Sequence, residues 1–278
     1  MLTRILTGIC LGLLAIPIGY FSHTLVLVAV VALLSAIGVF EMLRCLGLHK
    51  NYHLAIPSYA IAVIAPALTR LLNAFTENGL MLFAFFYLYA LYVLACAMFS
   101  KGKILFADAA KAVVSTAYIV CGFSCVVATR DLPNGMFLLI MVIVVAFSTD
   151  IFAYFSGMLF GRHKLIPEVS PKKTIEGAIG GTLIAAAAFV GCAILYANFY
   201  EVGRPHVLSL FACGVALSFV SQVGDLIASF IKRERDVKDY GHLFPGHGGV
   251  LDRFDSVVAV APVLYLLLSD SAFFTLFK

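Results

Sequence analysis

Acidic and basic side chains gather between positions 221 and 256 of a chain that is, as a whole, 62% hydrophobic and only 12% charged. If this stretch begins as a helix, Ser221, Asp225, Ser229 and Lys232 lie along one face, because residues three and four apart are neighbours on a helix. That face places a carboxylate inside an apolar helix, where a charge without a role is costly. A solvated helix end followed by a basic loop would explain Lys232 but not Asp225. Asp225 is therefore a candidate functional residue.

A glycine-rich loop at 245–249 follows, and two further carboxylates open the next apolar run. The glycines around His247 let the backbone approach a ligand such as a phosphate closely. Asp252 and Asp255 are three residues apart, so we expect them to share a face in the first turn of the next helix. The two helix ends would bring Asp225 and Asp252 together, and paired carboxylates suit Mg²⁺ that is shared with substrate phosphates.

Another carboxylate, Asp150, lies in an earlier apolar stretch. Tyr154 and Gly157 follow it by four and seven residues, so one helix face would carry a carboxylate, a hydroxyl and a small residue. We expect Gly177 and Gly181, which are four residues apart, to allow close helix packing rather than to take part in chemistry.

The segment 170–174 reads Ser-Pro-Lys-Lys-Thr. Ser170 is a favourable N-cap and Pro171 a favourable first helical residue, so we expect a helix to begin there. Its free N–H groups, with Lys172, Lys173 and Thr174 in the first turn, would form an anion site that matches a triphosphate. The alternative is that the two lysines only fix the membrane topology.

The motifs also exclude several kinds of enzyme. The chain has no G-x-G-x-x-G after a strand, no Walker A loop and no H-E-x-x-H helix. What remains, carboxylates and cations between apolar helices, suits phosphoryl or nucleotidyl transfer, in which positioning and charge neutralisation supply most of the catalysis.

These residues resemble the signature of the phosphatidate cytidylyltransferases, also called CDP-diacylglycerol synthases. The matching positions, at fixed spacings, are Ser229, Lys232, Arg233, Lys238, Asp239, Gly241, Pro245, His247, Gly248, Gly249, Asp252, Arg253 and Asp255. The stretches around 149–157 and 170–177 are similar to a second block of the family. The specific resemblance therefore covers roughly residues 147–256, and the first 130 residues match by hydropathy alone.

The resemblance implies that phosphatidate and CTP give CDP-diacylglycerol and pyrophosphate, with Mg²⁺ and with room for a monovalent cation such as K⁺. It implies catalytic roles for Asp225, Asp252, Lys232, Arg233, Arg253 and His247, and metal binding by Asp225, Asp252 and Asp255. For His247 two roles stay open: a donor to the leaving pyrophosphate, or a residue that only shapes the loop. For CTP or phosphatidate binding it implies Asp150, Tyr154, Ser170, Lys172, Lys173, Thr174, Ser221, Ser229, Lys238, Asp239, Gly248 and Gly249.

The mean hydropathy of +1.03 excludes a soluble globular domain and predicts an all-α, polytopic integral membrane protein. Apolar runs predict about nine transmembrane helices, at roughly 4–22, 24–42, 54–72, 79–99, 104–128, 135–160, 175–200, 206–231 and 250–274. On this topology all of the 19 Lys and Arg residues lie on one side except Arg70, Arg130, Arg204 and Lys278. The positive-inside rule then places the N-terminus and residues 229–255 in the cytoplasm, in a cell (cytoplasmic or inner) membrane. The basic residues lie in separate short loops without aromatic neighbours, so nucleic acid is not an expected partner.

We expect residues 1–130 to be scaffold helices, with homodimer contacts as an option, and residues 131–278 to be the catalytic helices. Glu41 and Arg44, three apart, are interpreted as an interfacial pair without a chemical role. Two other functions stay open: a CTP-dependent lipid kinase of the polyprenol or phytol type, and a cation-coupled transporter with Asp150 and Asp225 in its ion path.

Overall fold

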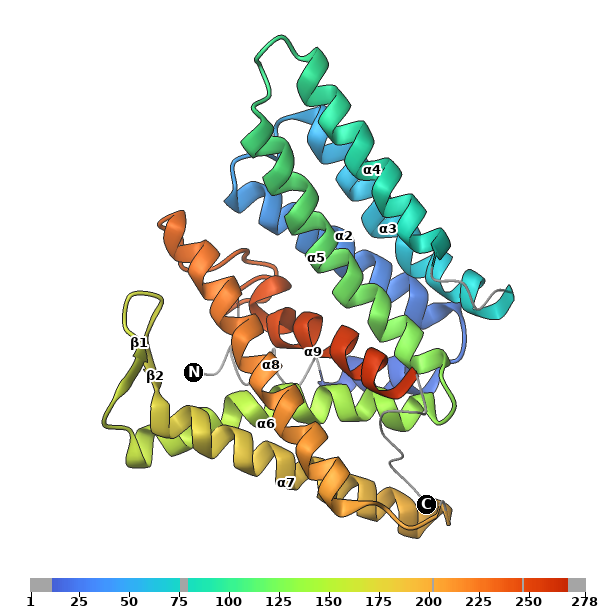
Figure 1. Cartoon of the computed structure of the whole chain (residues 1–278), viewed down its shortest axis with the longest axis vertical. Helices are drawn as coiled ribbons and strands as arrows, with labels where there is room; N and C mark the ends of the chain where they lie inside the picture. Colours follow the sequence, from blue (N-terminus) through green and yellow to red (C-terminus); the bar gives the residue numbers. More distant parts are fainter. Residues whose placement is uncertain (1–11, 76–79, 202, 247, 270–278) are drawn as a thin grey trace. The chain divides into compact units, whose positions relative to one another are not determined.

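A computed structural model of the chain describes residues 12–75, 80–201, 203–246 and 248–269 (Figure 1). Apart from one short hairpin, the named elements are helices, so the prediction of an all-α membrane protein is confirmed. In chain order they are α2 Leu25–Cys45, α3 Tyr52–Phe75, α4 Leu80–Phe99, α5 Phe106–Asp131, α6 Gly135–Phe160, β1 Lys164–Ile166, β2 Ser170–Thr174, α7 Ile175–Tyr200, α8 Val207–Glu234 and α9 Leu251–Ser269.

Seven described helices, α2 to α8, are long and apolar enough to cross a membrane. Helix α9 is not among them, because Asp252, Arg253 and Asp255 lie within its first five residues. The predicted first span, 4–22, lies partly outside the described residues, which are helical from 12 to 20. The protein is thus a multi-pass membrane protein, and the predicted count of nine spans exceeds the seven that length and composition support in the described part.

The chain forms two compact units. Unit 1 comprises Met1–Asp131 and Arg235–Phe254, and unit 2 comprises Leu132–Glu234 and Asp255–Lys278. In unit 1, helix α5 packs against α2, α3 and α4, and α3 also packs against both α2 and α4. Gly38 of α2 makes room for this core, because a Cβ there would lie 3.2 Å from Leu251 and 3.3 Å from Ile119. The first residue of α9 therefore belongs to the core of unit 1.

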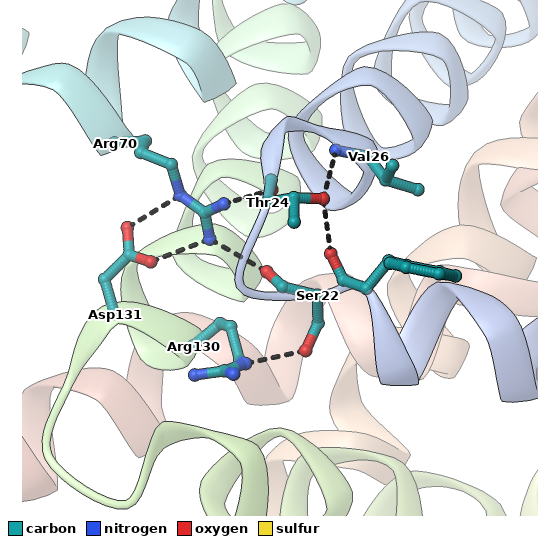
Figure 2. A network of polar contacts seen from close by, with 7 residues as sticks. Ser22, Thr24, Val26, Arg70, Arg130 and Asp131 are labelled. Carbon is teal, nitrogen blue, oxygen red and sulfur yellow. Dashed lines mark hydrogen bonds and ion pairs between the residues drawn. The ribbon is translucent and has the colours of Figure 1, made fainter.

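A polar network fastens the end of α3 and the end of α5 to the segment before α2 (Figure 2). The Arg70 guanidinium donates to both carboxylate oxygens of Asp131, at 2.7 and 3.2 Å, and to the backbone carbonyls of Ser22 and Thr24. Arg130 Nε donates to Ser22 Oγ at 2.7 Å. The side chains of Arg70 and Asp131 are only 16% and 22% exposed, so this ion pair is shielded from full solvent screening.

In unit 2, helices α6 and α7 run antiparallel in close contact, and α8 packs against both. Small residues allow the approach of α6 and α7: a Cβ on Gly177 would lie 2.6 Å from Ala153 O, and one on Gly181 would lie 2.9 Å from Thr149 O. The predicted packing role of these two glycines is confirmed.

The start of α7 differs from the prediction. Residues 164–166 and 170–174 form an antiparallel hairpin, in which Lys164 pairs with Thr174. Helix α7 begins at Ile175, and its N-cap is Thr174, whose hydroxyl accepts from Gly177 N–H at 3.1 Å. The prediction that Ser170 caps the helix was wrong, because Thr174 is an equally suitable N-cap and Pro171 is tolerated in an edge strand. Lys172 and Lys173 therefore lie on a strand.

Candidate active site

Three carboxylates gather in unit 2, one from each of helices α6, α8 and α9. The carboxylate of Asp255 interacts electrostatically with those of Asp225 and Asp150 and with the ammonium of Lys232. Ser256 Oγ donates to Asp150 Oδ2 at 3.2 Å. Like charges in a poorly solvated place repel strongly, so this arrangement calls for cations. The structure thus brings together three of the predicted acidic site residues.

The first cation is Lys173. Its ammonium, from β2, forms a salt bridge with Asp225 Oδ2 of α8, and the two side chains are 25% and 23% exposed. The hairpin therefore places Lys173, a predicted nucleotide-binding residue, in contact with Asp225, a predicted metal ligand. Lys172, the neighbouring residue of the strand, is exposed.

The polar face of α8 is confirmed. Ser221 is fully buried, Lys232 is 9% exposed, and Ser229 Oγ lies 3.5 Å from Asp225 Oδ1. The Ser221 hydroxyl has no hydrogen-bond partner among the described residues. A buried hydroxyl of this kind is a group that a ligand can satisfy.

Hydroxyl and amide contacts connect α8 to α6 and α7 within the two turns before Asp225. Thr149 Oγ1 donates to Ser218 Oγ at 2.8 Å, and Gln222 Nε2 donates to Thr182 Oγ1 at 2.8 Å. Interhelical bonds of this kind stabilise membrane helix packing. They set the rotation of α8 and therefore the direction in which its polar face points.

The hairpin is held at its base by Glu176, which the sequence analysis did not single out. Its carboxylate accepts from the N–H groups of Arg162, at 3.0 Å, and His163, at 3.2 Å, and contacts His163 Nδ1 at 2.6 Å. Arg233 Nε, from the end of α8, reaches Val169 O at 3.4 Å. These contacts order the strand that presents Lys173.

The loop between α8 and α9, residues 235–250 of unit 1, binds the carboxylate of Asp252, which lies in the first turn of α9. Asp252 Oδ2 accepts from Tyr240 N–H at 2.8 Å and from Gly249 N–H at 2.9 Å. Gly248 has φ +86° and Phe244 N–H donates to its carbonyl at 2.9 Å, so the predicted need for glycine in this loop is confirmed. His247 lies outside the described residues.

Glu41 and Arg44 of α2 contact the same loop. Glu41 is 3% exposed and accepts from Val250 N–H and Leu251 N–H, and Arg44 Nη2 donates to Tyr240 O at 2.6 Å. The interpretation of an interfacial pair was wrong. The signal that could have found Glu41 is the one that found Asp225: a carboxylate inside an apolar helix.

Other predicted residues are more solvated. Tyr154 is 65% exposed, and its ring meets Phe155 edge-on. Lys238, Asp239 and Arg253 are exposed and Ser170 is half-buried.

The donors fit Mg²⁺ by their chemistry, because they are carboxylate and hydroxyl oxygens. Within the described residues, no group of three or more His, Cys, Asp or Glu side chains is arranged so that it could hold a metal ion by itself. Mg²⁺ commonly takes one or two carboxylates and completes its shell with water and substrate phosphates.

The comparisons with known proteins agree with this chemistry. Residues 2–270 match the cytidylyltransferase family. This chain belongs to that family. It is 34% identical to a phosphatidate cytidylyltransferase of Staphylococcus epidermidis over 277 residues, which are 96% of this chain and 99% of that protein.

Two further relatives carry the same name. The phosphatidate cytidylyltransferase of Staphylococcus aureus (strain COL) is 40% identical over 179 residues, 64% of this chain and 66% of that protein. That of Staphylococcus haemolyticus is 40% identical over 176 residues, 63% of this chain and 65% of that protein. These two alignments span slightly less than two thirds of the relatives' own length. Family membership favours neither the lipid kinase nor the transporter.

Proposed function

We propose that the protein is a CTP:phosphatidate cytidylyltransferase, a nucleotidyltransferase of phospholipid biosynthesis. The observation that carries the proposal is the set of Asp150, Asp225 and Asp255 beside Lys173 and Lys232 in a chain of this family. The name of the relative that spans nearly the whole chain supports CTP and phosphatidate as substrates.

The phosphate of phosphatidate is already an anionic oxygen nucleophile, so attack on the α-phosphorus of CTP needs no strong protein base. A bond forms between that oxygen and the α-phosphorus, and the bond from the α-phosphorus to the bridging oxygen of the β-phosphate breaks. Pyrophosphate leaves with the electron pair. Catalysis then depends on alignment and on neutralising the charges of two phosphorylated substrates.

The chain's cations supply part of that neutralisation. Lys173 and Lys232 lie among carboxylates. Three further cations are exposed and close in sequence to site residues: Lys172 precedes Lys173, Arg233 follows Lys232, and Arg253 stands two residues before Asp255. Lys and Arg groups aimed at phosphate oxygens stabilise the charge that moves onto the leaving group. The Ser221 hydroxyl is a further donor for a substrate oxygen.

Bound Mg²⁺ would supply Lewis-acid stabilisation of the triphosphate. The ligands proposed for it are the carboxylates of Asp225, Asp252 and Asp255, and Asp150 would serve the substrates or a monovalent cation such as K⁺. The cytoplasmic orientation of the site, which gives access to CTP, and a homodimer formed through residues 1–130 are further parts of the proposal.

The test is product analysis with the purified full-length protein in detergent, given CTP, phosphatidate and Mg²⁺. We expect CDP-diacylglycerol and pyrophosphate in equal amounts, and neither product with Asp225→Asn. Phosphorylated lipid with CDP would instead indicate a lipid kinase, and absence of any lipid product from the wild-type protein would refute the proposal.

A further inference from the structure

Helix α9 presents Asp252 in its first turn, and an apolar residue stands directly before the helix. The residue before its first residue, Leu251, is Val250, which has no polar side chain to accept from the free N–H groups of the first turn. Both residues instead donate to a carboxylate that lies more than 200 positions earlier in the chain: Val250 N–H to Glu41 Oε1 at 3.0 Å and Leu251 N–H to Glu41 Oε2 at 2.9 Å. Glu41 thus acts as the N-cap of α9 from helix α2.

The loop is also shaped around this carboxylate. A Cβ on Gly241 would lie 2.8 Å from Glu41 Cδ, and a Cβ on Gly249 would lie 2.6 Å from Glu41 Oε2. Real Cβ atoms are essentially never found so close to a neighbour, so both positions require glycine while Glu41 stays in place. One turn along α2, Arg44 donates to Tyr240 O at 2.6 Å. Helix α2 therefore holds both sides of the loop, at 240–241 and at 249–251.

Those two sides are the ones that hold Asp252. Tyr240 N–H and Gly249 N–H both donate to Asp252 Oδ2, at 2.8 and 2.9 Å. Gly249 itself packs on Glu41, and Tyr240 is the neighbour of Gly241, which also packs on Glu41. A change at Glu41 would therefore move the donors that fix the rotamer of Asp252, although Glu41 need not touch a substrate.

We propose that Glu41 is a positioning residue for Asp252, an inference that rests on the proposed function through the role given to that carboxylate. The charge of Glu41 matters as well as its shape. Each of the two N–H donors meets its own oxygen of the Glu41 carboxylate, and the start of a helix favours a negative charge. Glutamine would offer one acceptor and would turn an NH₂ group toward the second donor.

The test compares Glu41→Gln with the wild-type full-length protein in detergent, without and with Mg²⁺. In metal-free protein we expect faster trypsin cleavage after the exposed Lys238, because the loop is less well held. In turnover we expect kcat to fall about 10- to 100-fold, the range seen when groups that orient metal ligands are removed. Half-maximal activation should require more Mg²⁺, and the KM for phosphatidate should be nearly unchanged.

Asp108→Asn removes a partly exposed carboxylate at 4.0 Å from Lys111 on α5. This variant is the matched control and should change neither the rate of trypsin cleavage nor the Mg²⁺ dependence of turnover. If Glu41→Gln fails to fold, Arg44→Gln loosens the same loop at Tyr240 and should shift cleavage and Mg²⁺ activation in the same direction. Wild-type cleavage and Mg²⁺ dependence in the folded variant, or reduced yield with unchanged Mg²⁺ activation, would overturn the positioning role. If the wild-type protein makes no CDP-diacylglycerol, the proposed function fails, while cleavage of the metal-free protein still decides whether Glu41 holds the loop.

Discussion

Lys173 of β2 forms a salt bridge with Asp225 of α8, so a residue predicted to bind the nucleotide neutralises a residue predicted to bind metal. Both side chains are about three-quarters buried, which makes the pair stronger than an exposed one and makes the loss of either partner costly. If Asp225 holds Mg²⁺ in the working enzyme, as proposed, the Lys173 ammonium would be available to bind substrate phosphates instead of this carboxylate.

This relationship separates the two lysines of the hairpin. Lys173→Ala should raise the KM for CTP about tenfold or more, the effect of losing a contact to a charged group, and should raise the KM for phosphatidate less. Lys172→Ala, the exposed neighbour on the same strand, should have a smaller effect. Initial rates over a range of CTP and of phosphatidate measure both constants, and an effect of Lys173→Ala on phosphatidate alone would reassign the residue to the lipid.

The proposed metal ligands give a second prediction. Asp225→Asn and Asp252→Asn are nearly isosteric and should each abolish turnover while the protein remains folded in detergent. Residues that act as one unit are non-additive, so the double variant should be scarcely worse than either single one. Asp239→Asn, at an exposed loop position, is the milder control. Near wild-type activity of Asp225→Asn or Asp252→Asn at limiting Mg²⁺ would contradict the assignment.

The network in Figure 2 predicts a loss of stability without a loss of substrate affinity. Arg70→Gln removes the ion pair with Asp131 and leaves a partly buried carboxylate, which should cost about 1–3 kcal/mol. Lys111→Gln, which removes a partly exposed pair with Asp108 at 4.0 Å, should change the free energy of unfolding by no more than about 0.5 kcal/mol. Thermal unfolding in detergent compares the two, and a raised KM for CTP in Arg70→Gln would show that the network also serves the site.

The orientation of the loop can be tested with a membrane-impermeant thiol reagent on single-cysteine variants. Tyr240 is 2% exposed and would react poorly wherever it faced, so the exposed Asp239 is the better position. We expect Asp239→Cys to be labelled only from the cytoplasmic side. Labelling from the opposite side in intact cells would reverse the topology and would separate the site from CTP.

The sequence was sufficient where one physical rule dominates. The cost of a charge in an apolar helix identified Asp150 and Asp225, helical periodicity predicted the polar face of α8, and close helix approach explained Gly177 and Gly181. Each of these inferences depends only on the spacing of residues within one helix.

Two features could not be read in this way. Ser170 and Thr174 are both acceptable N-caps, and the choice between them depends on hairpin contacts such as those of Glu176 with His163. Glu41 shows the same limit over a longer distance, because its two donors, Val250 and Leu251, come from the other end of the chain. Local spacing carries no information about such a pairing.

The most direct test of the account follows the phosphorus atoms of CTP. The purified protein is given phosphatidate with CTP labelled either at the α-phosphate or at the γ-phosphate, and the lipid fraction is counted. We predict that label from the α-phosphate enters the lipid and that label from the γ-phosphate leaves as pyrophosphate. Transfer of the γ-label to lipid, or no transfer of either label by an active preparation, would contradict cytidylyl transfer.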